Sequence, residues 1–278
     1  MIEILKAVLF GIVEGITEWL PVSSTGHIIL LDEFIQLQAT DAFKSMFDVV
    51  IQLGAILAVI VLFFHKLNPF AFRTKTKQER KDTWKLWFKV CVAILPSGIL
   101  GVLFDDMLEE YLHHGVPVAI ALIVYGIAFI LVERRNQGKY ARSVSDVHDI
   151  SWKTAIAIGC FQVLSLIPGT SRSGSTILGA ILLGVGRGAG AEFSFFMAIP
   201  TMLGASAIKL LKFFLETGDR MTSSELTVLA VGMVVSFVVS LLVIKGLMEY
   251  VRKHSFSVFG VYRIILGIIV LGYFLLIG

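Results

Sequence analysis

The sequence predicts an all-α polytopic membrane protein, and its composition and apolar runs carry that prediction. Of its 278 residues, 56% are hydrophobic and only 16% are charged, whereas soluble domains carry about 25% charged residues. The mean hydropathy is +0.84. The runs AILAVIVLFF and VLAVGMVVSFVVSLLV lack the alternating polarity of transmembrane β-strands. A soluble domain is excluded, and helices are favoured over a β-barrel.

Six segments are long and apolar enough to be membrane-spanning helices, each of which needs about 20 residues. These segments are 46–65, 86–104, 116–132, 193–214, 225–248 and 258–277. The shortest of them, 116–132, is followed by the charged group Glu133-Arg134-Arg135. We expect all six to belong to a single membrane domain over 1–278.

Two other apolar stretches are interrupted by polar residues. The first, 2–31, is broken around Pro21, and the second, 152–184, is broken around Pro168. Proline ends a helix, and a Ser or Thr after it can cap the next one. Non-helical backbone at membrane depth is tolerated only where it is buried in protein or lines a cavity. We therefore predict two re-entrant helical hairpins.

The two breaks also predict an inverted repeat. LPVSS at 20–24 aligns with IPGTS at 167–171, 147 residues later. Each half then has one hairpin and three spans. Because three is an odd number of crossings, the second half has the opposite orientation in the membrane to the first. Broken helices at matching positions are typical of inverted repeats whose site lies near the membrane midplane. We place the repeats at approximately 1–135 and 150–278.

Basic residues fall mostly in one set of predicted loops, which sets the orientation. One side holds the basic run 73–89 together with Lys66, Arg134, Arg135, Lys139, Arg142, Lys153, Arg187, Lys245, Arg252 and Lys253, and the other holds Lys6, Lys44, Lys209, Lys212 and Arg220. Basic loops stay in the cytoplasm, so both termini are expected outside. The partner is the lipid bilayer, and a net charge of only +3 gives no reason to expect nucleic acid.

Two carboxylates lie inside the first broken stretch. Glu14 and Glu18 are four residues apart, so on a helix they share a face, with Cβ atoms about 5–6 Å apart. In a low-dielectric site both stay ionised only if they share a cation, and otherwise one is protonated. Carboxylates with a purely structural role are rare inside membranes. We interpret this pair as functional.

Hydroxyl and basic side chains cluster at both breaks, as SSTGH over 23–27 and SRSGST over 171–176. Alone, the first cluster could be a helix N-cap and no more. The second contains Arg172, and an arginine at membrane depth needs an anionic partner. Hydroxyls and helix N-termini suit phosphate oxygens. If the breaks meet, the site suits phosphate ester or anhydride chemistry, and the candidate substrate ligands are Ser23, Thr25, Ser171, Ser173 and Thr176.

These motifs closely resemble those of the bacterial undecaprenyl-diphosphate phosphatase family, also known for bacitracin resistance. The resemblance rests on EGITEWLPVSSTGH over 14–27, PGTSRSGST over 168–176, FDVVIQLG over 47–54 and EFSFF over 192–196. It implies a multi-pass protein of the bacterial plasma membrane. It further implies hydrolysis of the prenyl diphosphate lipid to the monophosphate and inorganic phosphate, at a site facing outside. This reaction recycles the carrier lipid for peptidoglycan synthesis, and it depends on a divalent cation, Mg²⁺ or Ca²⁺.

Several roles for the candidate residues are compatible with this chemistry. We expect Ser24 to be the nucleophile, activated by Glu18 or His27, and Arg172 to stabilise the transferred phosphoryl group. Glu14 and Glu18 would hold the cation. Attack by His27, with Ser24 only a phosphate ligand, and attack by a metal-bound water are the two other mechanisms that the sequence leaves open.

The rival function is transport. An inverted repeat with re-entrant hairpins is a common transporter architecture, and a flippase for lipid phosphates would also use Arg172 and anion-binding helix starts. Paired carboxylates with hydroxyls and an imidazole in one short motif favour hydrolysis. A purely structural scaffold would leave Glu14, Glu18 and Arg172 costly without a reason.

Overall fold

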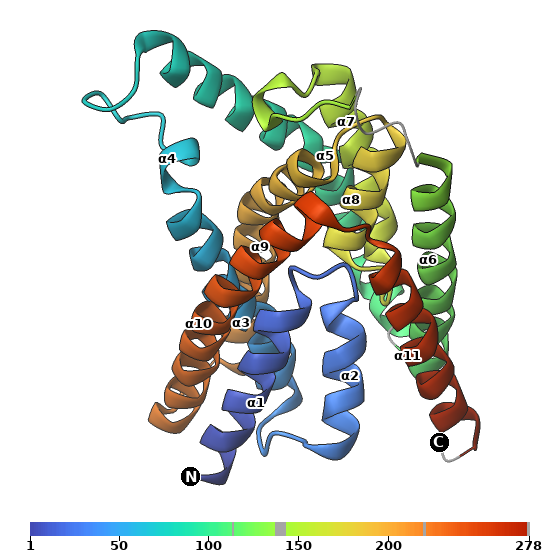
Figure 1. Cartoon of the computed structure of the whole chain (residues 1–278). Helices are drawn as coiled ribbons and strands as arrows, with labels where there is room; N and C mark the ends of the chain where they lie inside the picture. Colours follow the sequence, from blue (N-terminus) through green and yellow to red (C-terminus); the bar gives the residue numbers. More distant parts are fainter. Residues whose placement is uncertain (113, 137–142, 219–220, 277–278) are drawn as a thin grey trace.

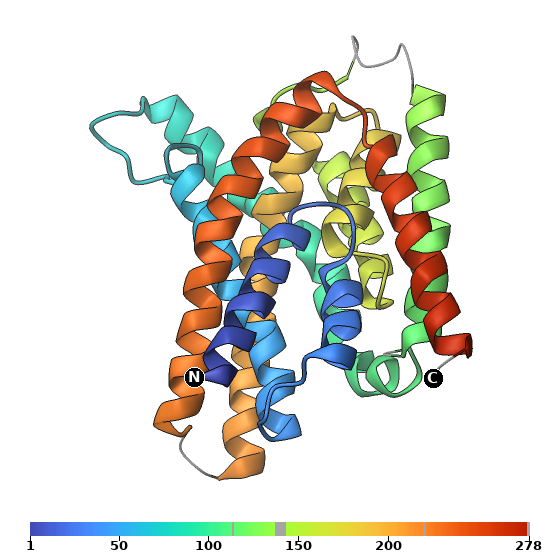
Figure 2. The ribbon, with the colours of Figure 1, turned by 60° about the horizontal axis from the view of Figure 1, so that its bottom comes forward.

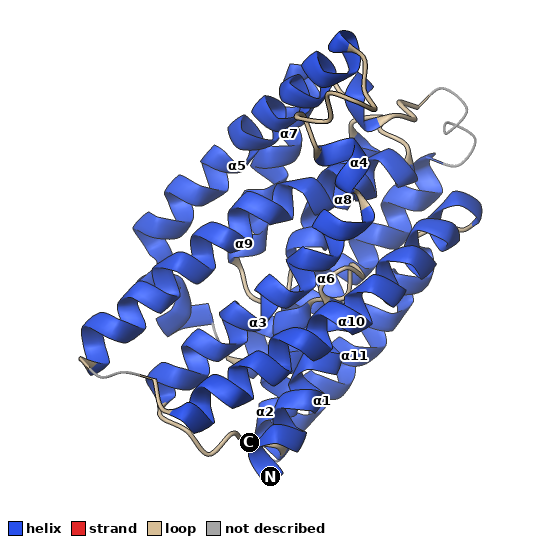
Figure 3. Ribbon diagram, turned by 90° about the vertical axis from the view of Figure 1, so that its left-hand side faces the viewer, coloured by secondary structure: helices blue, strands red, loops and turns tan. Residues whose placement is uncertain are grey.

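The computed structural model describes residues 1–112, 114–136, 143–218 and 221–276, and within these ranges its regular elements are helices (Figure 1 and Figure 3). In this part of the chain, six helices are long and apolar enough to cross a membrane. They are α3 (Asp41–Leu62), α5 (Lys77–Leu112), α6 (Gly115–Asn136), α9 (Arg187–Thr217), α10 (Ser223–Lys253) and α11 (Ser257–Leu276). The prediction of six spans is confirmed. Lys139, Arg142, Arg220 and residue 277 lie outside the described residues.

The start of α5 differs from the prediction, which placed a basic loop before residue 86. Residues 77–85 are helical. The cause is a capping box: the Thr76 amide donates to the Glu79 carboxylate at 2.7 Å, and the Glu79 amide donates to the Thr76 hydroxyl at 3.2 Å. Apolar residues mark only the part of a helix that crosses the lipid, so hydropathy gives no sign of a polar first turn such as this one.

The shorter helices form two antiparallel pairs. The first pair is α1 (Ile2–Thr17) and α2 (Ser24–Phe34), and the second is α7 (Trp152–Val163) and α8 (Arg172–Leu182). In Figure 1 and Figure 2, the first pair extends from the end of the bundle that carries both termini, and the second pair extends from the opposite end. The breaks within the two pairs therefore meet near the middle of the molecule. The remaining helical pieces, α4 (Phe64–Leu67), η2 (Val147–Asp149) and η3 (Leu164–Leu166), are short.

Glycines bring helix backbones close together around these pairs. A Cβ atom added at Gly11 would lie 2.7 Å from the carbonyl oxygen of Gly232, and one at Gly15 would lie 2.8 Å from that of Ser236. Helix α1 thus packs against α10 through a small-xxx-small pair. The α6–α11 interface uses the same device, because a Cβ at Gly126 would lie 2.7 Å from the Gly260 oxygen.

Replacing Gly15 with alanine is expected to destabilise the protein by about 1–3 kcal/mol, because α1 and α10 must separate to admit the methyl group. The matched control is Gly246→Ala on α10, where an added Cβ meets no atom within 4 Å. This control should be neutral or slightly stabilising. Thermal unfolding in detergent measures both, and equal melting temperatures for the two variants would contradict the prediction.

Candidate active site

The two breaks share an uncommon backbone conformation. Ser23 caps α2 with φ of 74°, and Ser171 caps α8 with φ of 72°. They are the two non-glycine residues with positive φ in the described part of the chain. Ser23 Oγ accepts from the Gly26 amide at 3.2 Å, and Ser171 Oγ accepts from the Gly174 amide at 3.1 Å. Strained conformations of this kind cost of order 1–3 kcal/mol and cluster at functional sites.

The carboxylate of Glu18 lies between Ser24 and Arg172. Ser24 Oγ donates to Glu18 Oε2 at 2.7 Å, and Arg172 Nη2 and Nε donate to Glu18 Oε1 at 3.0 and 3.3 Å. The third guanidinium nitrogen, Nη1, donates to the carbonyl of Ser194 at 2.8 Å. Glu18 and Ser24 are 5% and 8% exposed. A serine hydroxyl is thus hydrogen-bonded to a possible base beside a guanidinium, which is the geometry of an activated nucleophile.

Other hydroxyls at the second break are engaged within the protein. Ser173 Oγ donates to the carbonyls of Glu18 at 3.0 Å and Leu20 at 3.3 Å, which ties the two breaks together. Thr176 Oγ1 shares a hydrogen bond of 2.6 Å with Ser194 Oγ. Both residues are buried. Their hydroxyls position the break and Arg172, while Thr25 is half-buried in the first turn of α2.

Arg263, which the sequence analysis missed, holds both breaks from α11. Its Nη1 donates to the Pro21 carbonyl at 3.0 Å, and its Nη2 donates to the carbonyls of Gly169 and Thr170 at 2.7 and 3.0 Å. The side chain is 0% exposed. The available signal was a lone arginine within an otherwise uncharged span, which is a functional indication by default.

His27 contacts Ser23 and Tyr262. Its Nδ1 lies 2.7 Å from the Ser23 carbonyl, and its Nε2 lies 2.7 Å from the Tyr262 hydroxyl. Because a carbonyl can only accept, we assign the proton to Nδ1, and Nε2 then accepts from Tyr262. The two rings are parallel, with centroids 5.7 Å apart. Both nitrogens of His27 are thus bonded to groups other than Ser24, and the group that does contact Ser24 is Glu18.

Glu14 lies one helical turn before Glu18 and is 1% exposed. Among the described residues, its Oε1 has no hydrogen-bond partner, so this oxygen is available to a cation. Glu18 also retains free lone pairs, because a carboxylate has about four acceptor sites. The described ranges contain no group of three or more His, Cys, Asp or Glu that could hold a metal. Two carboxylates suit Mg²⁺ when phosphate oxygens complete its shell, so the pair fits a cation that binds with a phosphorylated substrate.

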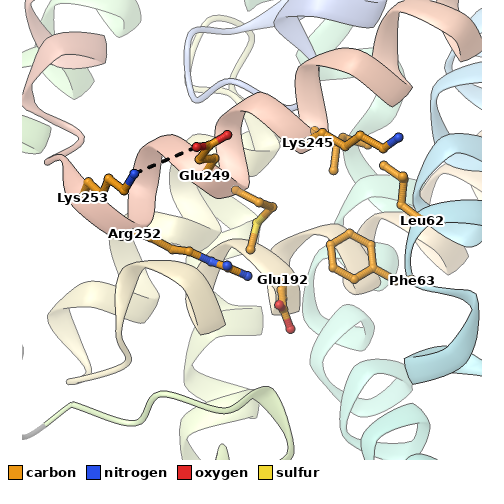
Figure 4. Close-up of a pocket in the computed structure, with 9 residues that line it drawn as sticks. Leu62, Phe63, Glu192, Lys245, Glu249, Arg252 and Lys253 are labelled. Carbon is orange, nitrogen blue, oxygen red and sulfur yellow. Dashed lines mark ion pairs between the residues drawn. The ribbon is translucent and has the colours of Figure 1, made fainter.

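Glu192 belongs to a different hollow (Figure 4), which lies beside the last turns of α10, at the end of the bundle opposite the termini (Figure 1). This cavity of about 460 Å³ is lined by Leu62, Phe63, Glu192, Ile244, Lys245, Met248, Glu249, Arg252 and Lys253. Lys66 Nζ lies 2.6 Å from Glu192 Oε2. Two residues later on α9, the Ser194 carbonyl holds Arg172 instead. Of Glu192 and Ser194, only Ser194 contacts a residue of the site.

Comparison with known proteins gives full-length relatives. The chain is 62% identical to the undecaprenyl-diphosphatase of Enterococcus faecalis over 97% of this chain and 96% of that protein. It is 58% identical to undecaprenyl-diphosphatase 1 of Clostridioides difficile over 100% and 98%. It is also 54% identical to the undecaprenyl-diphosphatase of Lactococcus lactis subsp. cremoris over 98% and 97%.

The sequence profile of one family covers almost the whole chain. The family described as "Bacitracin resistance protein BacA" matches residues 7–269, a range that includes both breaks and Arg263. All the site residues named above fall within the matched range. Among the described helices, only the start of α1 and the end of α11 lie outside it. With relatives of more than half identity over nearly its full length, the chain belongs to the BacA family of bacitracin resistance proteins.

Proposed function

We propose that this protein hydrolyses undecaprenyl diphosphate to undecaprenyl phosphate and inorganic phosphate in a bacterial plasma membrane. The observation that carries this function is the hydrogen bond from Ser24 to Glu18, with Arg172 bound to the same carboxylate. The full-length relatives bear the name of this activity. Release of the monophosphate returns the carrier lipid to peptidoglycan synthesis.

In the mechanism that the geometry favours, Ser24 Oγ attacks the terminal phosphorus of the diphosphate. Glu18 takes the Oγ proton, the bond from phosphorus to the bridging oxygen breaks, and undecaprenyl phosphate leaves. Glu18 passes this proton to an oxygen of the departing undecaprenyl phosphate. Water then attacks the phosphoserine, Glu18 accepts a proton from the water and returns it to Ser24 Oγ, and inorganic phosphate leaves. Glu18 acts as the base in preference to His27, because its Oε2 lies 2.7 Å from Oγ.

Positive charge and backbone amides stabilise the transferred group. In phosphoryl transfer the charge is spread over three equatorial oxygens, and Arg172 can reach them by exchanging one of its bonds to Glu18. The helices α2 and α8 both begin at the site, so their N-termini favour an anion there. Glu14 and Glu18 would hold Mg²⁺ or Ca²⁺, which when bound neutralises charge on the diphosphate.

We also propose that the two helix pairs are re-entrant hairpins of an inverted repeat, over approximately 1–135 and 150–278, in a single membrane domain. The matching caps at Ser23 and Ser171 support this. They are 148 residues apart, one more than in the alignment of LPVSS with IPGTS, which pairs Ser23 with Thr170 instead. The charge distribution supports an outside location for both termini. Arg187 begins α9 and Lys253 ends α10, at the end of the bundle opposite the termini (Figure 1). The first break then opens toward the outside.

The proposed activity is tested by release of inorganic phosphate from prenyl diphosphates by the purified protein in detergent. Ser24→Ala should lower kcat by about 10³-fold or more, and His27→Ala by much less. A trapped phosphoenzyme should be acid-stable, as phosphoserine is, and an acid-labile one would identify His27 as the nucleophile. Absence of release by folded protein, across chain lengths and cations, would reject the enzyme and favour lipid-phosphate transport.

Removing divalent cations with EDTA is expected to abolish phosphate release, and Mg²⁺ or Ca²⁺ should restore it. Glu14→Gln should raise the cation concentration needed for half-maximal activity by about tenfold or more, because it removes a charged ligand. Glu192→Gln is the control, since Glu192 pairs with Lys66 in the other hollow. Full activity in EDTA, or an unchanged cation requirement in Glu14→Gln, would argue against a cation at this pair.

A further inference from the structure

A diphosphate bound at Ser24 and Arg172 is enclosed by protein, whereas a long prenyl chain is most stable in lipid. If the proposed function holds, on which this inference rests, the chain must pass between two neighbouring helices. A suitable pair is one held together by side chains, because side chains rotate far more readily than packed backbones separate.

Several helix pairs around the site are closed by direct backbone contact. Between α1 and α10, a Cβ at Gly11 would meet the Gly232 oxygen at 2.7 Å, and between α6 and α11, a Cβ at Gly126 would meet the Gly260 oxygen at 2.7 Å. A Cβ at Gly54 would lie still closer to the backbone oxygen of Met233 on α10. Such pairs open only if whole helices move apart, so they are poor routes for a lipid chain.

The seam between α2 and α11 is built differently. Helix α2 packs on α1 and α6, and its Ile29 and Leu30 pack against an apolar cluster to which α11 contributes Leu266 and Val270. Helix α2 also meets α11 through two aromatic pairs. His27 stacks on Tyr262 with ring centroids 5.7 Å apart, and Phe34 meets Tyr273 at 5.6 Å. The first pair lies at the start of α2 and the second at its end. The seam is closed by side chains throughout, so rotation of these rings, together with the aliphatic side chains between them, would open it along the length of α2.

This seam joins the site to the apolar outside of the bundle. His27 follows Ser24 in the first turn of α2, while Tyr262 is 44% exposed and Phe34 is 67% exposed. Along α11, Ile265 and Ile269 are 55% and 58% exposed, so an isoprenoid chain leaving the seam would meet apolar side chains. A diphosphate at Ser24 thus lies beside the inner end of the seam.

Opening the seam would also change the surroundings of the site. The Tyr262 hydroxyl occupies Nε2 of His27, and this hydrogen bond must break when the Tyr262 ring turns away. We propose that the prenyl chain enters and leaves through the α2/α11 seam, with Tyr262 as the gate at its inner end. Passage of the chain then frees Nε2 of His27, which donates to a diphosphate oxygen only after it takes up a proton.

The test is a reversible lock across the seam. Phe34 and Tyr273 are both changed to cysteine in a background where the exposed Cys91 and Cys160 are alanine. The new thiols are joined with methanediyl bis-methanethiosulfonate, a short reagent that dithiothreitol removes. The matched control joins Phe70→Cys to Trp84→Cys, whose native rings are 5.5 Å apart and lie away from the site.

Phosphate release is measured with undecaprenyl diphosphate and with dimethylallyl diphosphate, whose five-carbon chain needs no portal. The seam lock should lower the ratio of the long-chain to the short-chain rate at least tenfold. Dithiothreitol should restore the ratio, and the control lock should leave it unchanged. An unchanged ratio in the locked protein would overturn the proposal of a portal at this seam. This holds whether both rates persist or both fall together. Failure of the unlocked protein to release phosphate would instead reject the proposed function.

Discussion

Replacing Arg172 with alanine is expected to lower kcat/KM for prenyl diphosphate hydrolysis by about 10³-fold or more. The guanidinium uses three nitrogens, two toward Glu18 and one toward the Ser194 carbonyl. Its loss removes the positive charge beside the transferred phosphoryl group and leaves the buried Glu18 carboxylate without its ion-pair partner. Phosphate release from the purified proteins measures the effect. Thermal unfolding of both proteins checks that the variant is folded like the unmodified protein.

Arg172→Lys should recover only a small part of the activity, because a single ammonium cannot reproduce the fork of donors that spans Glu18 and Ser194. Arg172→Ala combined with Glu18→Gln should cost far less than the product of the two single effects, since the two side chains act as a unit. Arg252→Ala, an exposed arginine elsewhere, is the control. A loss of less than tenfold in Arg172→Ala would show that this arginine is not required for the chemical step.

Replacing Arg263 with methionine is expected to cause the largest loss of stability among single changes near the site. Methionine has a comparable length but donates no hydrogen bonds, so the carbonyls of Pro21, Gly169 and Thr170 lose the donor that now joins them. Each buried carbonyl left unpaired costs about 1–3 kcal/mol. Thermal unfolding in detergent should show a clear drop in melting temperature, accompanied by loss of phosphate release.

Arg263→Lys separates charge from geometry, because one ammonium can reach fewer of these carbonyls than the guanidinium does. Its melting temperature should fall between those of the unmodified protein and Arg263→Met. Ile265→Met, two residues along α11 and 55% exposed, controls for the change of side chain on α11. A melting temperature for Arg263→Met that equals that of Ile265→Met would show that the breaks hold together without this residue.

The sequence was sufficient for the six spans and the two breaks, because both are local properties. A span needs only a run of apolar residues, and a break needs only Pro21 or Pro168 followed by capping hydroxyls. Glu14, Glu18 and Arg172 could be singled out for the same reason, since a charged residue in an apolar stretch is conspicuous wherever its partner lies. The capping box at Thr76 is also local, but its residues are polar and therefore leave no trace in the hydropathy of the chain.

The contacts within the site could be decided only by tertiary structure. Arg172 and Glu18 are 154 residues apart, and Arg263 reaches Pro21 across 242 residues. Helical periodicity specifies which face of a helix a residue occupies, but it does not specify which helix packs there. The packing of close-fitting glycines and the positive φ of Ser23 and Ser171 set how the breaks meet. That packing selected Glu18, rather than His27, as the partner of Ser24, and turned His27 toward Tyr262.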